Sequence, residues 1–226
     1  MPRARTVDLP LPELGRRDGL AYALFTPPDA PAGGVLILHG AGSAKESHYD
    51  FARACLRFGF AALCFDARGH GESEGDLGAG VLDDLASMAA LLPRPLALRG
   101  SSMGGYLAIV GAERVRADAV VAICPASADG LSRGARSGRF DVRVDLPSLE
   151  AFLSEHDARQ AVTGLEAPLL LLHAEGDEQV PVEHSRELAK LAPNARLLAI
   201  PGGHHRSIQH DGELQGESLR WLTKVL

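Results

Sequence analysis

The stretch PLALRGSSMGGYLAIVGAERV, residues 95–115, contains the pattern on which the predicted fold depends. Residues 95–100 form a short apolar run, typical of a strand buried on both faces of a sheet. The run passes through a tight Gly-x-Ser-x-Gly turn around Ser102 into the helix-forming segment 103–115. Glycines flank the serine because other side chains would collide in so sharp a turn. A strand, a tight turn and a helix in immediate succession indicate a mostly parallel sheet flanked by helices.

The rest of the chain repeats this alternation of short apolar runs and longer amphipathic segments. Further strands are predicted at 19–25, 34–39, 60–66, 119–124, 168–173 and 195–200. Helices are predicted at 48–59, 81–92, 182–193 and 213–226. An antiparallel edge is expected near the N-terminus, with TVDLPL (6–11) pairing against 19–25. The whole chain, 1–226, is therefore expected to form one α/β domain, with a mostly parallel central sheet and helices on both faces.

Residues 126–164 interrupt this alternation, because they contain few apolar runs and many Gly, Ser and Arg residues. An unstructured loop of that length is unusual in a compact domain unless it is functional. We expect an insertion over one end of the sheet, part loop and part helix at 148–162. It is either a lid or a variable surface excursion. Within it, 131–143 has four arginines and one aspartate; it is either a solvated charged face or a surface that attracts anionic substrates.

Composition excludes several classes of protein. The 46% hydrophobic and 23% charged residues are those of an ordinary globular protein, and the net charge of −6 argues against a nucleic-acid surface. The three cysteines suit neither a disulfide framework nor a zinc site. No apolar run approaches the roughly 20 residues that cross a bilayer, and the N-terminal residues lack the apolar core of a secretion signal. We expect a soluble, cytoplasmic protein of undetermined oligomeric state, with no membrane span.

Three serines occupy the centre of a Gly-x-Ser-x-Gly pattern, and their context separates them. Ser132 has no predicted strand before it. Ser73 lies between two glutamates, whose charges would disfavour an alkoxide or an oxyanion, and it leads into a glycine-rich segment instead of a helix. Ser102 alone follows a predicted strand and precedes a predicted helix. The sequence therefore favours Ser102 as a nucleophile.

A serine hydroxyl needs a base within hydrogen-bond reach, and the base needs an acid that orients it. In a sheet of this class, catalytic groups gather beyond the carboxyl ends of the strands. The loop HAEGDEQVP follows one predicted strand and supplies Glu175 and Asp177. The loop PGGHH follows the last predicted strand and supplies His204 and His205. Nucleophile, acid and histidine then occur in the chain order of a known class of hydrolases.

Taken together, these motifs resemble those of the α/β-hydrolase superfamily, in its branch of small esterases and monoacylglycerol-lipase-like enzymes. HGAG (39–42) is similar to the oxyanion-hole loop of that family, and FDARGHGES (65–73) to its D-x-R-G-x-G-x-S segment. GSSMGG resembles the nucleophile turn. HAEGDEQVP resembles H-G-x-x-D-x-x-V-P, with Ala174 in place of the usual glycine. The resemblance extends from about residue 34 to the C-terminus and omits the expected insertion.

This resemblance implies a role for each candidate residue. Ser102 would be the nucleophile, and the D-x-x-V-P register selects Asp177 over the neighbouring glutamate as the acid. The final G-x-x-H motif of the family, laid on PGGHH, selects His205 as the base. The backbone amides of Ala41 and Met103 would form the oxyanion hole.

The implied activity is hydrolysis of small-molecule carboxylic esters with short to medium acyl groups, through an acyl-enzyme. Neither a cofactor nor a metal is expected, and no nucleic-acid partner. A thioesterase or an acyl-peptide hydrolase would use the same three residues, so both stay open as alternatives. A non-catalytic small-molecule receptor would be expected to lack one member of the triad, and this chain has all three.

Overall fold

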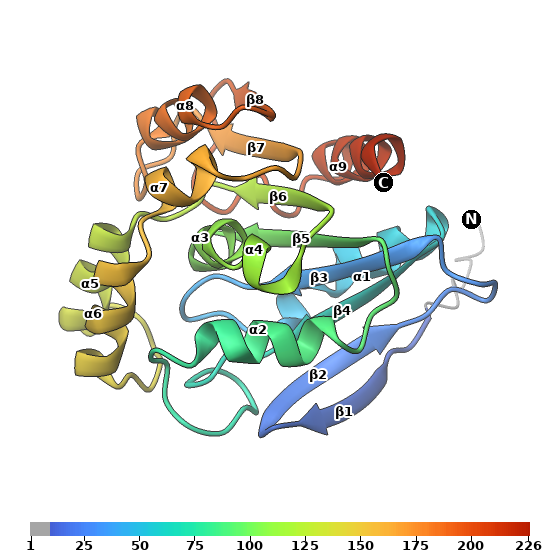
Figure 1. The fold of residues 1–226 in the computed structure, drawn as a ribbon, viewed down its shortest axis with the longest axis horizontal. Helices are drawn as coiled ribbons and strands as arrows, with labels where there is room; N and C mark the ends of the chain where they lie inside the picture. The colour runs from blue at the N-terminus through green and yellow to red at the C-terminus, as the bar shows by residue number, and fades with distance from the viewer. Residues whose placement is uncertain (1–9) are drawn as a thin grey trace, which may run out of the picture.

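The structure is a computed structural model that describes residues 10–226. Its centre is an eight-stranded sheet with the order β1-β2-β4-β3-β5-β6-β7-β8 (Figure 1). The strands are β1 (Glu13–Arg17), β2 (Leu20–Phe25), β3 (Gly33–Leu38), β4 (Phe60–Phe65), β5 (Leu96–Ser101), β6 (Ala119–Ile123), β7 (Leu169–Ala174) and β8 (Ala195–Ile200). All seven strands predicted from apolar runs are present. The sheet runs parallel from β4 to β8, as expected for strands joined by helices.

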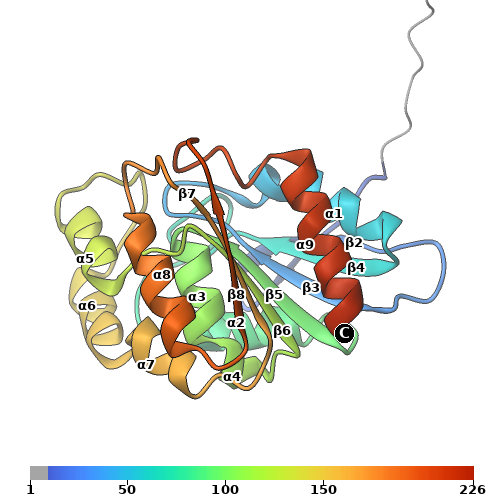
Figure 2. The same cartoon turned by 90° about the horizontal axis from the view of Figure 1, so that it is seen from above.

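Helices cover both faces of the sheet. They are η1 (Lys45–His48), α1 (Tyr49–Arg57), α2 (Val81–Ala89), α3 (Met103–Val110), α4 (Ala112–Val115), α5 (Ala128–Arg136), α6 (Leu146–Glu155), α7 (Ala158–Thr163), α8 (Val182–Leu191) and α9 (Gly212–Val225). Figure 2 shows α1 and α9 on one face, and α2, α3 and α8 on the other. This arrangement confirms the predicted fold class.

The antiparallel edge forms from a different segment than the sequence predicted. β1 pairs with β2 in the antiparallel sense, and Glu13 lies opposite Leu24. Residues 6–9 of the predicted strand TVDLPL lie outside the described residues, and Leu11 is exposed and precedes β1. A two-residue turn, with positive φ at both Asp18 and Gly19, reverses the chain between β1 and β2 and sets this register.

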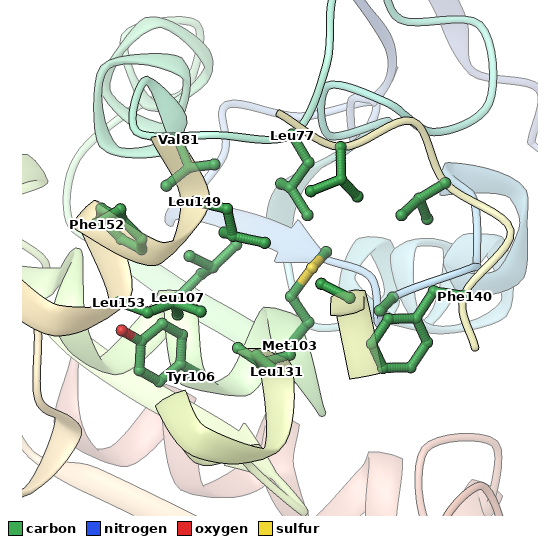
Figure 3. A pocket seen from close by; sticks show the side chains of 14 residues that line it. Leu77, Val81, Met103, Tyr106, Leu107, Leu131, Phe140, Leu149, Phe152 and Leu153 are labelled. Atoms are coloured by element: carbon green, nitrogen blue, oxygen red, sulfur yellow. The ribbon is translucent and has the colours of Figure 1, made fainter. Parts of the chain in front are cut away.

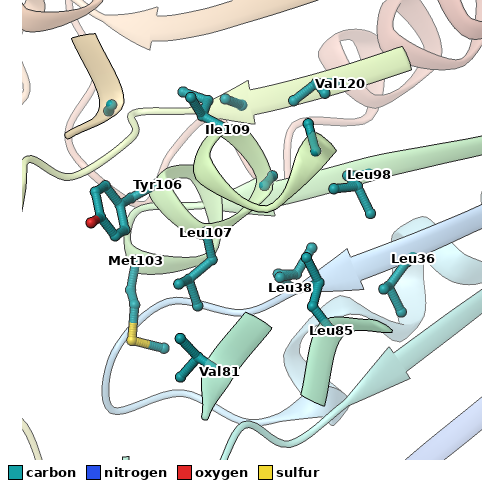
Figure 4. Packing of buried hydrophobic residues seen from close by; sticks show 14 of the residues in the cluster. Leu36, Leu38, Val81, Leu85, Leu98, Met103, Tyr106, Leu107, Ile109 and Val120 are labelled. Atoms are coloured by element: carbon teal, nitrogen blue, oxygen red, sulfur yellow. The ribbon is translucent and has the colours of Figure 1, made fainter. Parts of the chain in front are cut away.

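Each face of the sheet has its own apolar core, because successive side chains of a strand point to opposite faces. Leu36 and Leu98 face the helices α2 and α3, as Figure 4 shows, in a cluster that also includes Leu188 of α8. Their neighbours Val35 and Ala97 face α1 and α9. β3 to β7 are buried along their whole lengths, whereas the edge strand β8 is mostly half-buried.

The predicted insertion contains three helices, more than the sequence indicated. α5 and α6 lie beyond the carboxyl ends of the strands, at one end of the sheet (Figure 1), and α7 packs against α3 and α8. The prediction of a helix within 148–162 is confirmed by α6 and α7. The prediction that 128–136 is loop is wrong: the segment forms α5, and the Ser127 hydroxyl accepts a hydrogen bond from Gly130 N at its start. Among residues 10–226, none of the helices has the length and apolar character needed to cross a membrane.

Candidate active site

Ser102 lies on a strained turn between β5 and α3. Its φ of 54° and ψ of −114° are rarely adopted by residues other than glycine. Three backbone hydrogen bonds hold this geometry. Ser102 N donates to Ile123 O at 2.9 Å, and Ser102 O accepts from Tyr106 N and Ala126 N, both at 3.0 Å. Such strain costs on the order of 1–3 kcal/mol and persists where the surroundings enforce it, commonly at functional sites.

Both glycines of the turn are required by close backbone approach. A Cβ on Gly100 would lie 2.0 Å from the carbonyl oxygen of Gly104, and a Cβ on Gly104 would lie 2.2 Å from that of Leu38. Backbone atoms cannot move aside as a flexible side chain does. The Gly-x-Ser-x-Gly pattern around Ser102 therefore has a steric cause here.

Asp177 and His205 are in direct contact. His205 Nδ1 donates to Asp177 Oδ2 at 2.7 Å. The other carboxylate oxygen, Oδ1, accepts from the backbone amides of Gln179 at 2.8 Å and Val180 at 2.9 Å. Burial acts to raise the pKa of Asp177, but the hydrogen bonds from His173, His205 and these amides hold it well below its usual range. The acid is therefore ionised and fixed in orientation.

The alternative acid and base lie on the surface. The His205 side chain is buried, whereas its neighbour His204 is exposed. Glu175 is turned toward α8, where it forms an ion pair with Arg186 at 2.7 Å. Of the two adjacent histidines, the structure brings only His205 to Asp177.

The two expected oxyanion donors belong to segments that adjoin Ser102. Met103 is the first residue of α3, so its amide has no helical carbonyl partner. Ala41 is the second residue of a turn closed by a hydrogen bond from Ser43 N to Gly40 O at 3.2 Å. The Ala41 amide takes no part in the hydrogen bond that closes this turn. A Cβ on Gly40 would lie 3.4 Å from Ser102 Cβ, which shows how closely this loop approaches the serine.

A buried ion pair anchors the loop that carries Ala41. Lys45 Nζ lies 2.8 Å from Asp66 Oδ2, and both side chains are excluded from solvent. Asp66 also accepts from the amides of Lys45 at 2.7 Å and Glu72 at 3.0 Å. Burial acts to raise the pKa of Asp66, but the bond from Lys45 and these amides lower it. The ion pair thus joins the loop at 40–48 to the segment at 65–73.

Ser102 and His205 line one cavity of about 430 Å³. Its other lining residues come from the Ala41 loop, the loop between α5 and α6, and the loops after β7 and β8: Gly40, Ala41, Gly42, Ser43, Ser47, Ser101, Arg139, Phe140, Asp141, Gln179, Arg206, Gln209 and His210. Most of these side chains are polar. The cavity is therefore a polar space open to the candidate nucleophile and base.

An apolar pocket lies on the other side of Met103, between the sheet and the helices α5 and α6 (Figure 3). Every side chain around it is apolar or aromatic: Ala41, Leu77, Val81, Met103, Tyr106, Leu107, Leu131, Ala135, Phe140, Val142, Val144, Leu149, Phe152 and Leu153. Its volume of about 20 Å³ holds roughly one water molecule. Ala41 and Phe140 line both this pocket and the polar cavity, so the two spaces adjoin.

The two rejected serines have structural positions. The Ser73 hydroxyl donates to Asp66 O at 2.6 Å and accepts from Ala21 N at 2.9 Å, which joins its loop to β2. Ser132 lies within α5, and its hydroxyl is 3.5 Å from Glu150 Oε1. Neither lines the cavity of Ser102.

Sequence reasoning did not anticipate a buried polar network beneath the turn. Ser101 Oγ donates to Gln209 Oε1 at 2.6 Å, and Arg99 donates to Gln209 O at 3.0 Å. Arg99 also donates to His48 Nδ1 at 2.8 Å, and burial lowers the pKa of this arginine to about 10. These bonds tie the strand before Ser102 to the loop that carries His205. The one sequence signal of this network was Arg99, a charged residue inside an otherwise apolar predicted strand.

Cys124, His173 and Asp177 bring potential metal-ligand atoms within 4.8 Å of one another. Both ring nitrogens of His173 already have protein partners, Ser185 Oγ at 2.7 Å and Val180 O at 2.9 Å. Burial raises the pKa of the Cys124 thiol to about 12, which disfavours the thiolate that metals bind. The geometry is that of a hydrogen-bonded cluster behind the carboxylate.

Comparisons with known proteins agree with this architecture. A family model described as "Serine aminopeptidase, S33" matches residues 29–140, and one described as "TAP-like protein" matches residues 153–215. The uncharacterized protein YfhR of Escherichia coli O157:H7 is 30% identical over 196 residues. The match covers 79% of this chain but only 65% of YfhR, so the chain spans less than two thirds of that relative.

Solved structures of low sequence identity share the fold. Est1E from Butyrivibrio proteoclasticus, with ferulic acid bound, has a TM-score of 0.78 and 22% identity, and the match covers 94% of this chain and 98% of Est1E. The monoacylglycerol lipase of Paleococcus ferrophilus has a TM-score of 0.70 and 22% identity, with coverage of 91% and 97%. At this identity the likeness concerns the fold alone.

Proposed function

The chain belongs to the α/β-hydrolase superfamily, and we propose that it hydrolyses carboxylic esters of short to medium acyl groups with Ser102 as nucleophile. The observation that carries the proposal is the 2.7 Å bond between His205 and Asp177 at a cavity that Ser102 also lines. A base oriented by an acid, in one cavity with a serine on a strained turn, is the set of groups that serine acyl transfer needs.

In the proposed reaction, Ser102 Oγ attacks the acyl carbon and its proton passes to His205 Nε2. His205 Nδ1 donates to Asp177, which leaves Nε2 free to accept this proton. The negative carbonyl oxygen is bound by the amides of Ala41 and Met103, whose orientation is set before the reaction. His205 then returns the proton to the leaving oxygen as the acyl–oxygen bond breaks. Water, activated in the same way, releases the acid and restores Ser102.

The two adjoining spaces suggest which part of an ester substrate each of them would bind. The apolar pocket of Figure 3 suits an acyl chain, because its lining side chains are apolar or aromatic and the one hydroxyl among them, that of Tyr106, already donates to His156 O. Its small volume favours short acyl chains unless α5 and α6 move away from the sheet. We propose that residues 126–164 act as a lid by such a movement, which would enlarge the pocket. The polar cavity is left for the alcohol part of the ester.

The alternatives use the same residues on a different bond. The family model described as a serine aminopeptidase, which matches residues 29–140, keeps amide hydrolysis under consideration, and a thioester would also fit the geometry.

The test is labelling by a fluorophosphonate probe, followed by panels of nitrophenyl esters, acyl thioesters and aminoacyl amides. We expect the wild type to be labelled and to cleave esters fastest, and Ser102→Ala to lose both properties. Equal labelling of wild type and Ser102→Ala would refute the assignment of the nucleophile. Faster cleavage of thioesters or amides than of esters would replace the proposed substrate class.

A further inference from the structure

Two arginines line the polar cavity with Ser102 and His205. Arg139 lies on the loop between α5 and α6, and Arg206 directly follows His205. Both side chains are exposed, and among residues 10–226 neither lies within 4.0 Å of a carboxylate oxygen. Two segments far apart in the sequence therefore bring unpaired positive charge to the same space.

Two other arginines of the insertion are already paired. Arg136 forms an ion pair with Glu150 on α6. Arg143 lies 3.7 Å from Asp76 and donates to the carbonyl oxygens of Ser73 and Gly75 at 3.0 Å. Of the four arginines in 131–143, Arg136 and Arg143 hold the insertion in place. Arg133 is exposed on α5 and lines neither space, which leaves Arg139 as the one that lines the polar cavity.

The remaining cavity wall is polar but carries little opposing charge. Asp141 is the one carboxylate among the lining residues, against Arg139 and Arg206. The neutral side chains of Ser43, Ser47, Gln179 and Gln209 supply hydroxyls and amides. The two arginines outnumber the one carboxylate in this cavity, although the chain has a net charge of −6.

We propose that the enzyme takes esters whose leaving group carries an anionic oxygen group, a phosphate or a carboxylate, held by Arg139 and Arg206. The guanidinium group matches the geometry of either anion. The acyl chain would occupy the apolar pocket beyond Met103, and the charged alcohol the polar cavity. This inference rests on the proposed ester hydrolysis and names the chemical class of its substrates.

The test compares esters that share one acyl group and differ in leaving-group charge. Hexanoyl esters of propane-1,3-diol, 4-hydroxybutanoate, 3-hydroxypropyl phosphate and choline carry neutral, carboxylate, phosphate and cationic leaving groups. We expect kcat/KM to be higher for the two anionic esters than for the diol ester, and lowest for the choline ester. The phosphate and carboxylate arms distinguish the two anions. Raising the salt concentration should reduce the advantage of the anionic esters, because exposed charges are screened.

Three variants locate the effect. Arg139→Gln and Arg206→Gln should each lower the anionic-to-neutral ratio of kcat/KM by about three- to tenfold, mainly through KM. Arg133→Gln is the matched control, because Arg133 is exposed on α5 and lines neither space. The neutral ester reports any indirect damage to His205 from the change at Arg206. An unchanged ratio in both cavity variants, or a wild type that prefers the choline ester, would overturn the inference.

The failure of this inference and that of the proposed function are distinguishable. If the neutral ester is cleaved and Ser102 is labelled, but charge makes no difference, then the anion site alone is wrong. If no ester is cleaved and Ser102 is not labelled, the proposed hydrolysis is wrong and the anion site falls with it.

Discussion

Replacing Asp177 by asparagine tests the hydrogen bond on which the proposed mechanism depends. Asparagine has the same shape, but one carboxylate oxygen becomes an NH₂ group. Oδ1 accepts from the amides of Gln179 and Val180, and only the remaining oxygen can continue to do so. Turning the side chain over would leave both backbone donors unpaired, at about 1–3 kcal/mol each. The NH₂ group therefore faces His205.

This orientation reverses the hydrogen bond to the imidazole. An NH₂ group can only donate, so His205 Nδ1 becomes the acceptor and its proton moves to Nε2. Nε2 then cannot accept the proton of Ser102. The loss of the correct tautomer typically lowers kcat by about 10⁴, or roughly 5.4 kcal/mol in the barrier. KM should change little, because Asp177 does not line the cavity.

The assay is steady-state hydrolysis of a short-chain nitrophenyl ester by wild type, Asp177→Asn and Glu175→Gln. Glu175 is the matched control, because it is an acid of the same loop that pairs with Arg186 at the surface. We expect its variant to keep wild-type kcat. An Asp177→Asn protein that is folded by circular dichroism and retains kcat within tenfold of wild type would refute the reasoning.

Four further substitutions have separate expected outcomes. His205→Gln should abolish turnover in the ester assay, whereas His204→Gln, at the exposed neighbour, should leave most of it. The reverse result would exchange the roles of the two histidines. Lys45→Met should reduce the free energy of unfolding by about 3–5 kcal/mol in denaturant titrations, because it leaves the Asp66 charge buried and unpaired. Because folding depresses the pKa of Asp66, this carboxylate stabilises the wild type at pH values above its unfolded pKa of about 4, and the stabilisation is lost as the pH falls. In the variant the stability should begin to fall at a higher pH than in the wild type during acid titration. Identical stability-versus-pH curves for the two proteins would contradict this. Leu153→Ala should cost about 2–5 kcal/mol and shift kcat/KM toward longer acyl chains, whereas an unchanged chain-length profile would exclude this pocket as the acyl site.

Strands and most helices could be predicted because their signals are local. An apolar run such as PLALRG reports burial on both faces, and HYDFARACLRFG reports one apolar helix face that ends at a glycine. The spacing of Gly100, Ser102 and Gly104 likewise reports a backbone geometry that few residue types allow. Each of these features depends on residues that are close together in the sequence, so a local sequence pattern is enough to predict it.

The missed helix α5 shows where local signals fail. Its sequence ADGLSRGAR contains two glycines, which lower helix propensity. Tertiary packing compensates: Leu131 is buried in the apolar cluster that also contains residues of α3 and α6, and a Cβ on Gly134 would lie 2.2 Å from the Phe140 ring. Gly134, which lowers helix propensity, is therefore the residue that makes room for Phe140 in the wall of the cavity.

By itself, the sequence determined the class of fold, the serine on its turn and the strand ends at which an acid and a base had to be sought. Only the tertiary structure decided that His205 and not His204 contacts Asp177, that Arg139 and Arg206 share a cavity, and that a polar and an apolar space adjoin. The physical reason is distance along the chain. Contacts such as Ser101 with Gln209, 108 residues apart, depend on how the whole sheet stacks and which side of a turn is buried, and no local pattern of residues specifies that.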